Sequence, residues 1–337
     1  MSKWIIKAYS KEKIETIKRL KELAKEKGVY SLNDIYFSPL KENQLGLYDT
    51  DNNVIVLDDD LIYAKEDEIK NIFLHELAHY IQYRYENTGD HGKTFHEICS
   101  GLGVATEYAK AKVKLSDKHN KAQKIQKLLA LSSSPEAPEA QAALKKAQQL
   151  MAETSVDSLD EDIIYEATIY QGKTIPTIIR QITAAAKTIS GGFAFIARTP
   201  TEATLSIYGT YEMVETFTYL YDYLEYQLER DYENYLSTTF LNGTITQKIN
   251  YYIGACNSII KRYSPSEANK DSRALVAINS QVKDKTAEIL FPNTRFRTKK
   301  RTFTYDEDAY SSGKEAGKNM QIRHGLKQKS SSQLFLE

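Results

Sequence analysis

The stretch from His75 to Glu97, HELAHYIQYRYENTGDHGKTFHE, holds four of the chain's six histidines. It begins with the pattern H-E-x-x-H, and apolar residues recur around this pattern with helical spacing. On a helix, a spacing of four residues places His75 and His79 on one face, about 6 Å apart along the axis. Two imidazoles in this position can chelate one ion, so the sequence predicts a helix with a metal site.

Glu76 lies about 100° round the same helix from His75, so its carboxylate can reach a metal-bound water without being a ligand. Zinc lowers the pKa of such a water toward about 7 and polarises a scissile carbonyl. Glu76 would then take the proton of the water and return it to the leaving amine. The alternative interpretation is a partly buried amphipathic helix that happens to carry two histidines, and apolar Ile72 and Phe73 fit both.

A catalytic zinc site needs three protein ligands and an open fourth position. The glycine and histidine that follow the second histidine in metzincins are replaced here by Gln82 and Tyr85, which excludes that class. Two candidates for the third ligand remain. Glu97 lies on the next predicted helix, and His91 lies where the chain must bend back, a bend that Gly92 would permit.

H-E-L-A-H followed by H-G-x-x-F at His91, Gly92 and Phe95 resembles the SprT-like zinc metallopeptidases. The preceding GLYDTDNNVIVLDDDLI is similar to the hairpin of that family, and the resemblance spans about residues 1–112. It implies one zinc ion held by His75, His79 and His91, with Glu76 as general base. His96 is then left with a structural or supporting role, and the alternative is a contact with the transition state.

Bacterial SprT proteins often carry a cysteine-rich zinc ribbon after the catalytic part. This chain has only two cysteines, Cys99 and Cys256, and a lysine-rich segment stands in that place. Substrate presentation is therefore expected to differ from that of the family, even where the chemistry is shared.

The pattern of elements predicts an α+β protein of three parts. Residues 1–113 are expected to form a small zincin-like domain, with a helix from Ser10 to Lys27, a short β-hairpin or sheet and two further helices. The strands are expected at 34–40, 44–50 and 54–60, and the helices at 66–85 and 93–112. Residues 114–156 are expected to form a helical hairpin, which an acidic linker follows. Residues 163–337 are expected to form an α+β domain rich in long helices, in which Gly313 and Gly317 allow two helices to pack closely.

The segment KIQKLLALSSSPEAPEAQAALKKAQQLMAE resembles the domain of unknown function 2786, a helical module often found in phage, prophage and bacterial proteins. The C-terminal part resembles the uncharacterised domain that commonly accompanies it. These resemblances bring no known reaction. They indicate a bacterial or mobile-element protein.

Lys+Arg and Asp+Glu both total 45, so any attraction to nucleic acid must be local. Two basic stretches are candidates, because basic residues interleaved with aromatics can contact phosphates and stack on bases. Their members are Lys114, Lys118, Lys121, Arg295, Arg297, Lys299, Lys300 and Arg301. The alternative is a solvated helix face and a charged loop.

The leading hypothesis from the sequence is a zinc-dependent metallopeptidase. SprT-like enzymes generally cleave proteins attached to DNA, so the resemblance implies a DNA-bound or crosslinked protein as substrate. A competing hypothesis is a non-catalytic, zinc-stabilised binding protein of a phage or mobile element that acts on nucleic acid or a host protein. Glu76 separates the two, because a structural zinc site does not need it. With no long apolar run and no apolar leader, we expect a cytoplasmic protein that does not enter a membrane.

Overall fold

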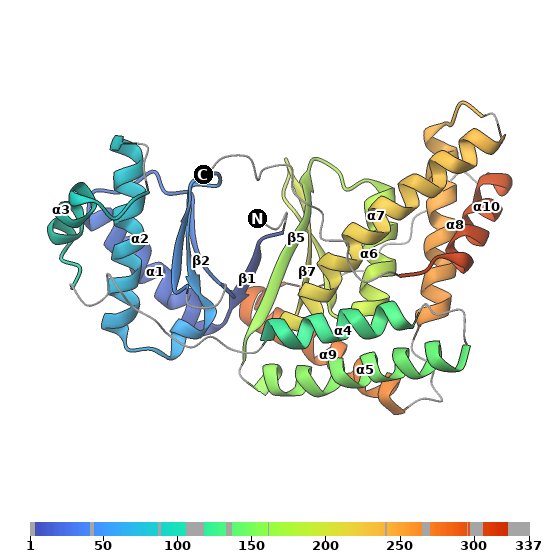
Figure 1. Cartoon of the computed structure of the whole chain (residues 1–337), viewed down its shortest axis with the longest axis horizontal. Coiled ribbons are helices and arrows are strands. Elements are labelled where there is room, and N and C mark those ends of the chain that lie inside the picture. Colours follow the sequence, from blue (N-terminus) through green and yellow to red (C-terminus); the bar gives the residue numbers. More distant parts are fainter. Residues whose placement is uncertain are drawn as a thin grey trace. The chain divides into compact units, whose positions relative to one another are not determined.

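The computed structural model, shown in Figure 1, describes residues 4–40, 44–86, 89–105, 118–132, 137–160, 162–239, 241–264, 270–294, 296 and 306–322. The protein mixes helices with a β-sheet, as the sequence predicts. It divides into two compact units. The first unit comprises Met1–Asp117, Asp162–Ala167 and Glu288–Pro292, and the second comprises Lys118–Glu161, Thr168–Ala287 and Asn293–Glu337.

The sheet of the first unit has the strand order β3-β4-β2-β1, followed by the start of β5. The strands are β1 (Ile6–Tyr9), β2 (Asp34–Ser38), β3 (Gly46–Asp49), β4 (Val54–Asp58) and β5 (Ile164–Gly172). β3 and β4 form the predicted antiparallel hairpin, whose turn contains Asn53 with a positive φ of 54°. β2 pairs in parallel with β4, whereas β1 is antiparallel to both β2 and β5. β3 therefore lies at the edge of the sheet.

The helices of the first unit are α1 (Lys11–Glu26), the 3₁₀ helix η1 (Asp59–Tyr63), α2 (Glu66–Glu86) and α3 (Lys93–Leu102). The Ser10 hydroxyl caps α1 by accepting the backbone N–H of Lys13 at 3.1 Å, as its position in the sequence predicts. α2 buries Phe73, Leu77 and Ala78 completely. The prediction that α3 continues to about residue 112 is wrong, because Gly103 ends the helix in the left-handed conformation at φ 81°.

The second unit begins with the predicted helical hairpin, α4 (Lys118–Leu131) and α5 (Ala137–Asp160). α5 runs through the segment that the sequence suggests is an acidic linker, so that prediction is wrong. The end of β5 is followed by α6 (Thr177–Ser190) and by the antiparallel strands β6 (Phe193–Arg198) and β7 (Ala203–Gly209). The strand order here is β5-β7-β6.

The remaining helices are α7 (Tyr211–Thr239), α8 (Ile245–Tyr263), α9 (Lys270–Leu290) and α10 (Glu307–Asn319), in agreement with the predicted richness in long helices. α10 lies alongside α8 in Figure 1, and the two pack closely. A Cβ at Gly313 would lie 2.0 Å from the carbonyl oxygen of Tyr251, and one at Gly317 would lie 2.3 Å from that of Ala255. The prediction that these glycines permit close packing is confirmed.

No helix within the described ranges combines the length and the apolar composition that a membrane span requires.

Candidate metal centre

Helix α2 supplies two of the histidines and the glutamate. Its apolar face is fixed in the core by Phe73 and Leu77, both fully buried. The four-residue spacing brings the His75 and His79 rings to a centroid distance of 5.0 Å, and both rings are partly buried. The helix therefore presents two imidazoles on one face, as H-E-x-x-H predicts.

His91 reaches the same place through a loop that hydrogen bonds fasten to α2. The Asp90 carboxylate accepts the side-chain N–H of Gln82 at 2.9 Å and the backbone N–H of Gly92 at 3.0 Å. These two bonds, the Gly92 bond first, hold the pKa of Asp90 below its usual value. Gln82 is fully buried, so its amide is a fixed anchor. In the sequence analysis Gln82 serves only to exclude the metzincin class.

Gly92 does not serve the role that the sequence suggests. Its φ of −71° and ψ of −169° are extended values that any residue adopts. What restricts the position is space, because a Cβ there would lie 3.0 Å from Oδ1 of Asp90. The glycine keeps room for the bond that fastens the His91 loop.

The three histidines meet round the ring of Phe95. His75 Nε2 and His91 Nε2 are 3.4 Å apart, and one ring nitrogen from each of His75, His79 and His91 lies within 4.8 Å of the others. Phe95 is fully buried, and its centroid lies 5.0, 4.4 and 4.7 Å from the rings of His75, His79 and His91 respectively. One aromatic residue from α3 thus packs against all three imidazoles.

Burial keeps two of these imidazoles neutral. Burial, together with the smaller effect of the neighbouring histidines, lowers the pKa of His75 and of His79 to about 4. At neutral pH the two rings therefore carry an unprotonated nitrogen, which is the form that binds a metal ion.

Glu76 points away from solvent, against strand β3. Its side chain is 7% exposed, and burial raises its pKa to about 8 although the backbone N–H of Tyr48 donates to it. Its fit against β3 depends on a glycine, since a Cβ at Gly46 would lie 2.6 Å from both Cγ and Oε1 of Glu76. Cys99 of α3 is also close, and its pKa is raised to about 11 by burial and then by the charge of Glu76.

Comparison with known families gives two matches. Residues 2–119 match the SprT-like family, and residues 122–158 match the family described as protein of unknown function (DUF2786). The chain carries a SprT-like domain followed by a DUF2786 segment. This order is the one that the sequence motifs predict, and the first family is one of zinc-metallopeptidase-like proteins. No curated protein and no solved structure matches the chain.

The donor atoms of the SprT-like domain fit a zinc ion. Imidazole nitrogens are among the preferred ligands of zinc, and two of them at about 2.0–2.1 Å from one tetrahedral ion are about 3.3 Å apart. The 3.4 Å between the Nε2 atoms of His75 and His91 agrees with that separation. The other ring nitrogen of His75, Nδ1, is buried and has no hydrogen-bond partner among the described residues. The assignment of His75, His79 and His91 as zinc ligands stays a prediction.

The two neighbours of Phe95 that the sequence leaves open lie outside this cluster. His96 is exposed and touches the Phe95 ring at a centroid distance of 5.9 Å. The side chain of Glu97 is 64% exposed, and its carboxylate lies 3.5 Å from the Lys93 ammonium. Within the described part of the chain, neither His96 nor Glu97 belongs to the group of residues whose ligand atoms lie close enough to bind one metal ion together with His75.

Most residues of the predicted nucleic-acid interface lie outside the described residues: Lys114, Arg295, Arg297, Lys299, Lys300 and Arg301. Lys118 begins α4, and Lys121 on the same helix is exposed. Phe296 of the second basic stretch packs on β6, with its centroid 5.1 Å from Phe193 and 4.8 Å from Phe195. Phe296 is therefore packed against other aromatic residues, and the nucleic-acid interface stays a prediction.

A second group of possible ligands lies where β4 of the SprT-like domain passes into η1, and it consists of Asp58, Asp59 and Asp60. The two Asp58 oxygens accept the backbone N–H groups of Leu40 and Asp60, at 2.9 and 3.1 Å. The hydroxyl of Tyr165 donates to the carboxylate of Asp59. These hydrogen bonds explain the cluster as a cap of η1 that also ties neighbouring strands together.

Proposed function

We propose that the SprT-like domain is a zinc-dependent peptidase that hydrolyses peptide bonds. The observation that carries the proposal is the meeting of three imidazoles beside a buried carboxyl group, Glu76, which is next to the first of them in the sequence. A zinc ion that only stabilises a fold needs its ligands and nothing more. A carboxyl group held next to such an ion by its own contacts is what a hydrolase requires.

The chain's own groups supply the proton transfers. The positive charge of a bound zinc ion would lower the raised pKa of Glu76 and favour its ionised form. In that form Glu76 accepts a proton from the attacking water and delivers it to the leaving amine, and the Tyr48 N–H and the space at Gly46 hold its carboxyl group in place. Phe95 fixes the three imidazoles, so little reorganisation is needed during the reaction. Zinc bound by them would act as a Lewis acid toward the water and the scissile carbonyl.

Strand β3 gives a substrate a place to lie. β3 is at the edge of the sheet, and Glu76 meets its backbone at Tyr48. An extended peptide can add to an exposed strand edge through main-chain hydrogen bonds. We infer that the substrate is an extended segment of a protein bound along β3, with its scissile bond beside Glu76.

The substrate that the family resemblance suggests is a protein bound or crosslinked to DNA. The support from the chain is the lysine-rich sequence before and within α4, where Lys121 is exposed. If this sequence holds DNA, the affinity falls steeply as salt is added, because phosphate contacts release counterions. No measurable binding to DNA at low salt would remove this part of the proposal.

The decisive experiment compares wild type with Glu76→Gln, with zinc measured by elemental analysis and cleavage measured on a protein substrate with and without DNA. The glutamine keeps the size of the side chain but cannot accept the proton. We expect one zinc ion per chain in both proteins and cleavage only by wild type. Zinc in both with no cleavage by either would favour the binding-protein hypothesis.

A further inference from the structure

Tyr83 continues the row of imidazoles on helix α2. His75, His79 and Tyr83 follow one another at intervals of four residues, so they share one face of the helix, each about 6 Å further along its axis. The side chain of Tyr83 is half-buried, whereas that of Tyr85, two positions further on, is exposed. The Tyr83 ring therefore lies one helical turn beyond the two histidines, on the face that carries them.

The contacts of Tyr83 place it beside the edge strand β3. Its ring lies against the ring of Tyr48, with the centroids 6.1 Å apart and the planes at 63°. Tyr48 is buried, and it is also held by the Tyr80 ring, at a centroid distance of 5.5 Å, and by the bond from its hydroxyl to Oδ1 of Asn53 at 3.2 Å. Tyr83 thus packs on an aromatic side chain that its other contacts fix in place.

Helix α2 and strand β3 run in the same direction along this contact. Gly46 lies against Glu76, and Tyr48, two residues further along the strand, lies against Tyr83. Two residues of an extended chain span about 6.7 Å, and the step from His79 to Tyr83 along the helix is about 6 Å. An extended substrate on β3, with its scissile bond beside Glu76, therefore passes Tyr83 about two residues from that bond.

We propose that Tyr83 determines specificity by packing against an aromatic side chain of the substrate, two positions from the scissile bond. The inference rests on the proposed peptidase function of the SprT-like domain. Aromatic rings prefer edge-to-face or offset contacts with one another, and Tyr83 already makes an edge-to-face contact with Tyr48. Its half-buried ring leaves surface for a second ring from the substrate, which an alanine at the same position would not cover.

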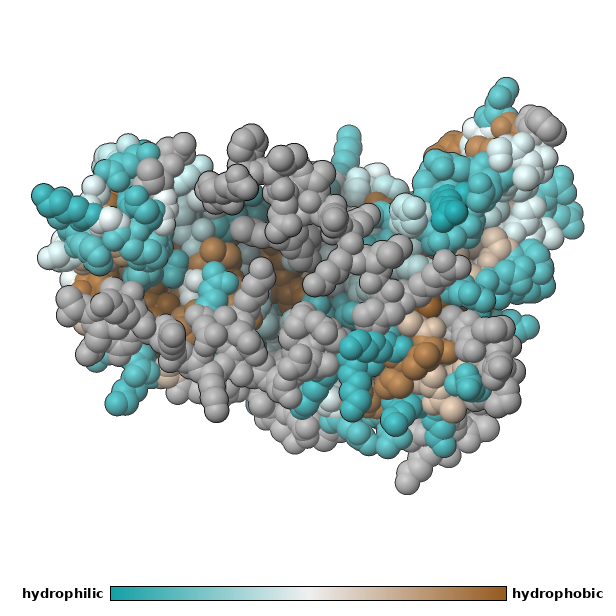
Figure 2. Space-filling model, in the orientation of Figure 1, coloured by the Kyte–Doolittle hydropathy of each residue, from teal (hydrophilic) through white to brown (hydrophobic). Residues whose placement is uncertain are grey.

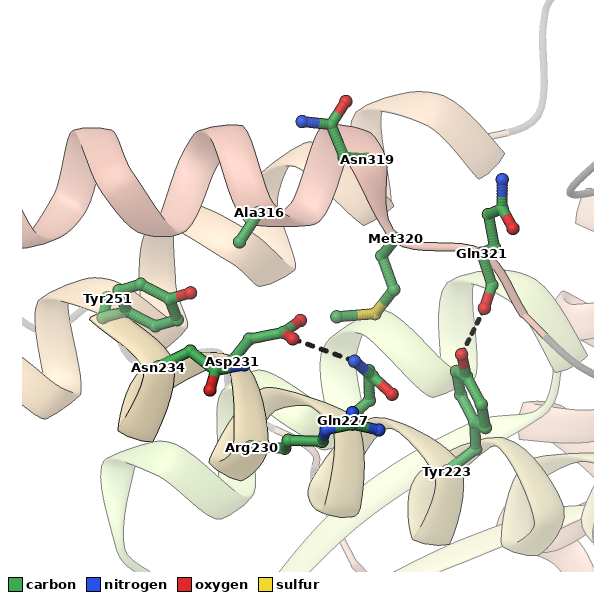
Figure 3. Close-up of a pocket in the computed structure, with 10 residues that line it drawn as sticks. All are labelled: Tyr223, Gln227, Arg230, Asp231, Asn234, Tyr251, Ala316, Asn319, Met320 and Gln321. Carbon is green, nitrogen blue, oxygen red and sulfur yellow. Dashed lines mark hydrogen bonds between the residues drawn. The ribbon is translucent and has the colours of Figure 1, made fainter. Parts of the chain in front are cut away.

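The cavity of the second unit has a different character. Figure 2 shows a mainly hydrophilic surface over α10. Beside α10, a cavity of about 460 Å³ is lined in part by carboxamides and by Arg230 and Asp231, whose charges balance (Figure 3). The Gln227 amide donates to Asp231 at 2.8 Å, so these two groups of the lining already hold each other. The lining indicates no single class of ligand, and the subsite at Tyr83 does not depend on it.

The test uses the full chain with Tyr83→Ala. Tyr85→Ala is the matched control, since it removes an exposed tyrosine from the same helix. Each protein digests a mixture of random-sequence decapeptides, and mass spectrometry locates every cleaved bond. We expect wild type and Tyr85→Ala to favour an aromatic residue over alanine about fivefold at one of the two positions that lie two residues from the bond. Tyr83→Ala should lose this preference, and Tyr83→Phe should keep it because the ring remains.

A merely structural role of Tyr83 gives a different result. If the ring only supported Tyr48, and through it Glu76, Tyr83→Ala would slow the cleavage of all peptides by the same factor and the preference would stay. That result would overturn the inference. A wild-type protein that cleaves peptides without preference for an aromatic residue at either position would overturn it as well.

A binding measurement separates this inference from the proposed peptidase activity. In the Glu76→Gln background, isothermal titration calorimetry compares the zinc-loaded protein with two Gly-Ser-Ala peptides, one with a central Phe and one with Ala in its place. We expect the Phe peptide to bind about fivefold more tightly, a difference that Tyr83→Ala removes and Tyr85→Ala keeps.

The combined results assign a failure to one proposal or the other. The expected difference in binding without any cleavage by wild type would leave the aromatic subsite and reject the peptidase. Cleavage by wild type with no aromatic preference in either assay would reject the subsite alone. Neither cleavage nor binding would reject both.

Discussion

Gly46 and Glu76 are pressed together across the space between β3 and α2. A Cβ at Gly46 would come within 2.6 Å of Cγ and of Oε1 of Glu76, and within 2.9 Å of its Cδ. The carboxyl group therefore occupies the volume that a side chain on β3 would fill. Any residue larger than glycine at position 46 must displace the group that we propose as general base.

The first prediction follows from that contact. Gly46→Ala should lower peptidase activity about a hundredfold while the zinc content stays at the wild-type level, because a displacement of about 1 Å in a catalytic group is enough for such a loss. Activity and elemental zinc are measured on the same preparation. Gly101→Ala is the control, since a Cβ at Gly101 meets nothing within 4 Å. Equal activities of the two variants would show that the contact does not position Glu76.

The second prediction concerns the third ligand. His91→Ala should weaken zinc binding more than about a hundredfold, since removal of a ligand costs more than removal of a supporting group. His96→Ala and Glu97→Ala should each keep close to one zinc ion per chain, because neither side chain reaches the other ligand nitrogens in the described structure. Competition with a chelator measures all three. A greater loss of zinc in Glu97→Ala than in His91→Ala would make the proposed ligand set wrong.

The third prediction concerns the group that fastens the His91 loop. Asp90→Ala removes the acceptor of the Gln82 and Gly92 N–H groups. We expect zinc affinity to fall about 10–100-fold, the usual effect of losing a group that orients a ligand. The fold should survive, because the Asp90 side chain is exposed. Chelator competition and circular dichroism measure the two effects, and unchanged zinc affinity would show that the loop needs no such anchor.

Local sequence signals are sufficient to predict three elements of the SprT-like domain. The cap at Ser10, the turn at Asn53 and the periodicity round His75 each lie within a few residues of the element they define, so α1, the β3–β4 hairpin and α2 are predicted correctly. The predicted helix from Lys93 to about residue 112 is too long, because α3 ends at Leu102. The left-handed residue decides the end of that helix.

The features that cannot be predicted from the sequence are contacts between residues that lie far apart along the chain. β1 is four residues long, and its pairing partner β5 begins more than 150 positions later, so no local pattern reveals it. The same holds for the site. Nothing near Gly46 indicates that Glu76 will lie against it, and Gln82 carries no sign of its bond to Asp90. The motif identifies the groups of the site, whereas the long-range contacts determine their positions.

The fourth prediction concerns the pH dependence of stability. Asp58 is 2% exposed, and burial raises its pKa to about 7, although the Leu40 and Asp60 N–H groups that donate to it act in the opposite direction. The usual pKa of Asp in an unfolded chain is about 3.9. The folded state thus binds the proton of Asp58 more tightly than the unfolded state does. The contribution of Asp58 to stability is therefore largest below pH 4 and falls as the pH rises to about 7.

Asp58→Asn removes this titration. The difference in free energy of unfolding, wild type minus variant, should therefore decrease between pH 5 and 7, by at most about 1.4 kcal/mol per pH unit. Urea unfolding of the metal-free proteins at several pH values measures it. Asp51→Asn, at an exposed position of the β3–β4 turn, should give a difference that does not change with pH. A constant difference for Asp58→Asn as well would show that its carboxyl group titrates normally in the folded protein.

The fifth prediction sets helix packing against helix propensity. Alanine is a better helix former than glycine by about 1 kcal/mol, so propensity alone predicts that Gly313→Ala stabilises α10. The packing predicts the opposite, because the new Cβ would meet the Tyr251 carbonyl oxygen at 2.0 Å and the Tyr251 backbone cannot move without disturbing α8. We expect a net destabilisation of about 1–3 kcal/mol, typical of overpacking. Ser311→Ala, at an exposed position of α10, should be neutral or slightly stabilising. Urea unfolding followed by circular dichroism measures the free energy of unfolding of both variants. A higher free energy of unfolding for Gly313→Ala than for wild type would mean that α10 does not lie against α8.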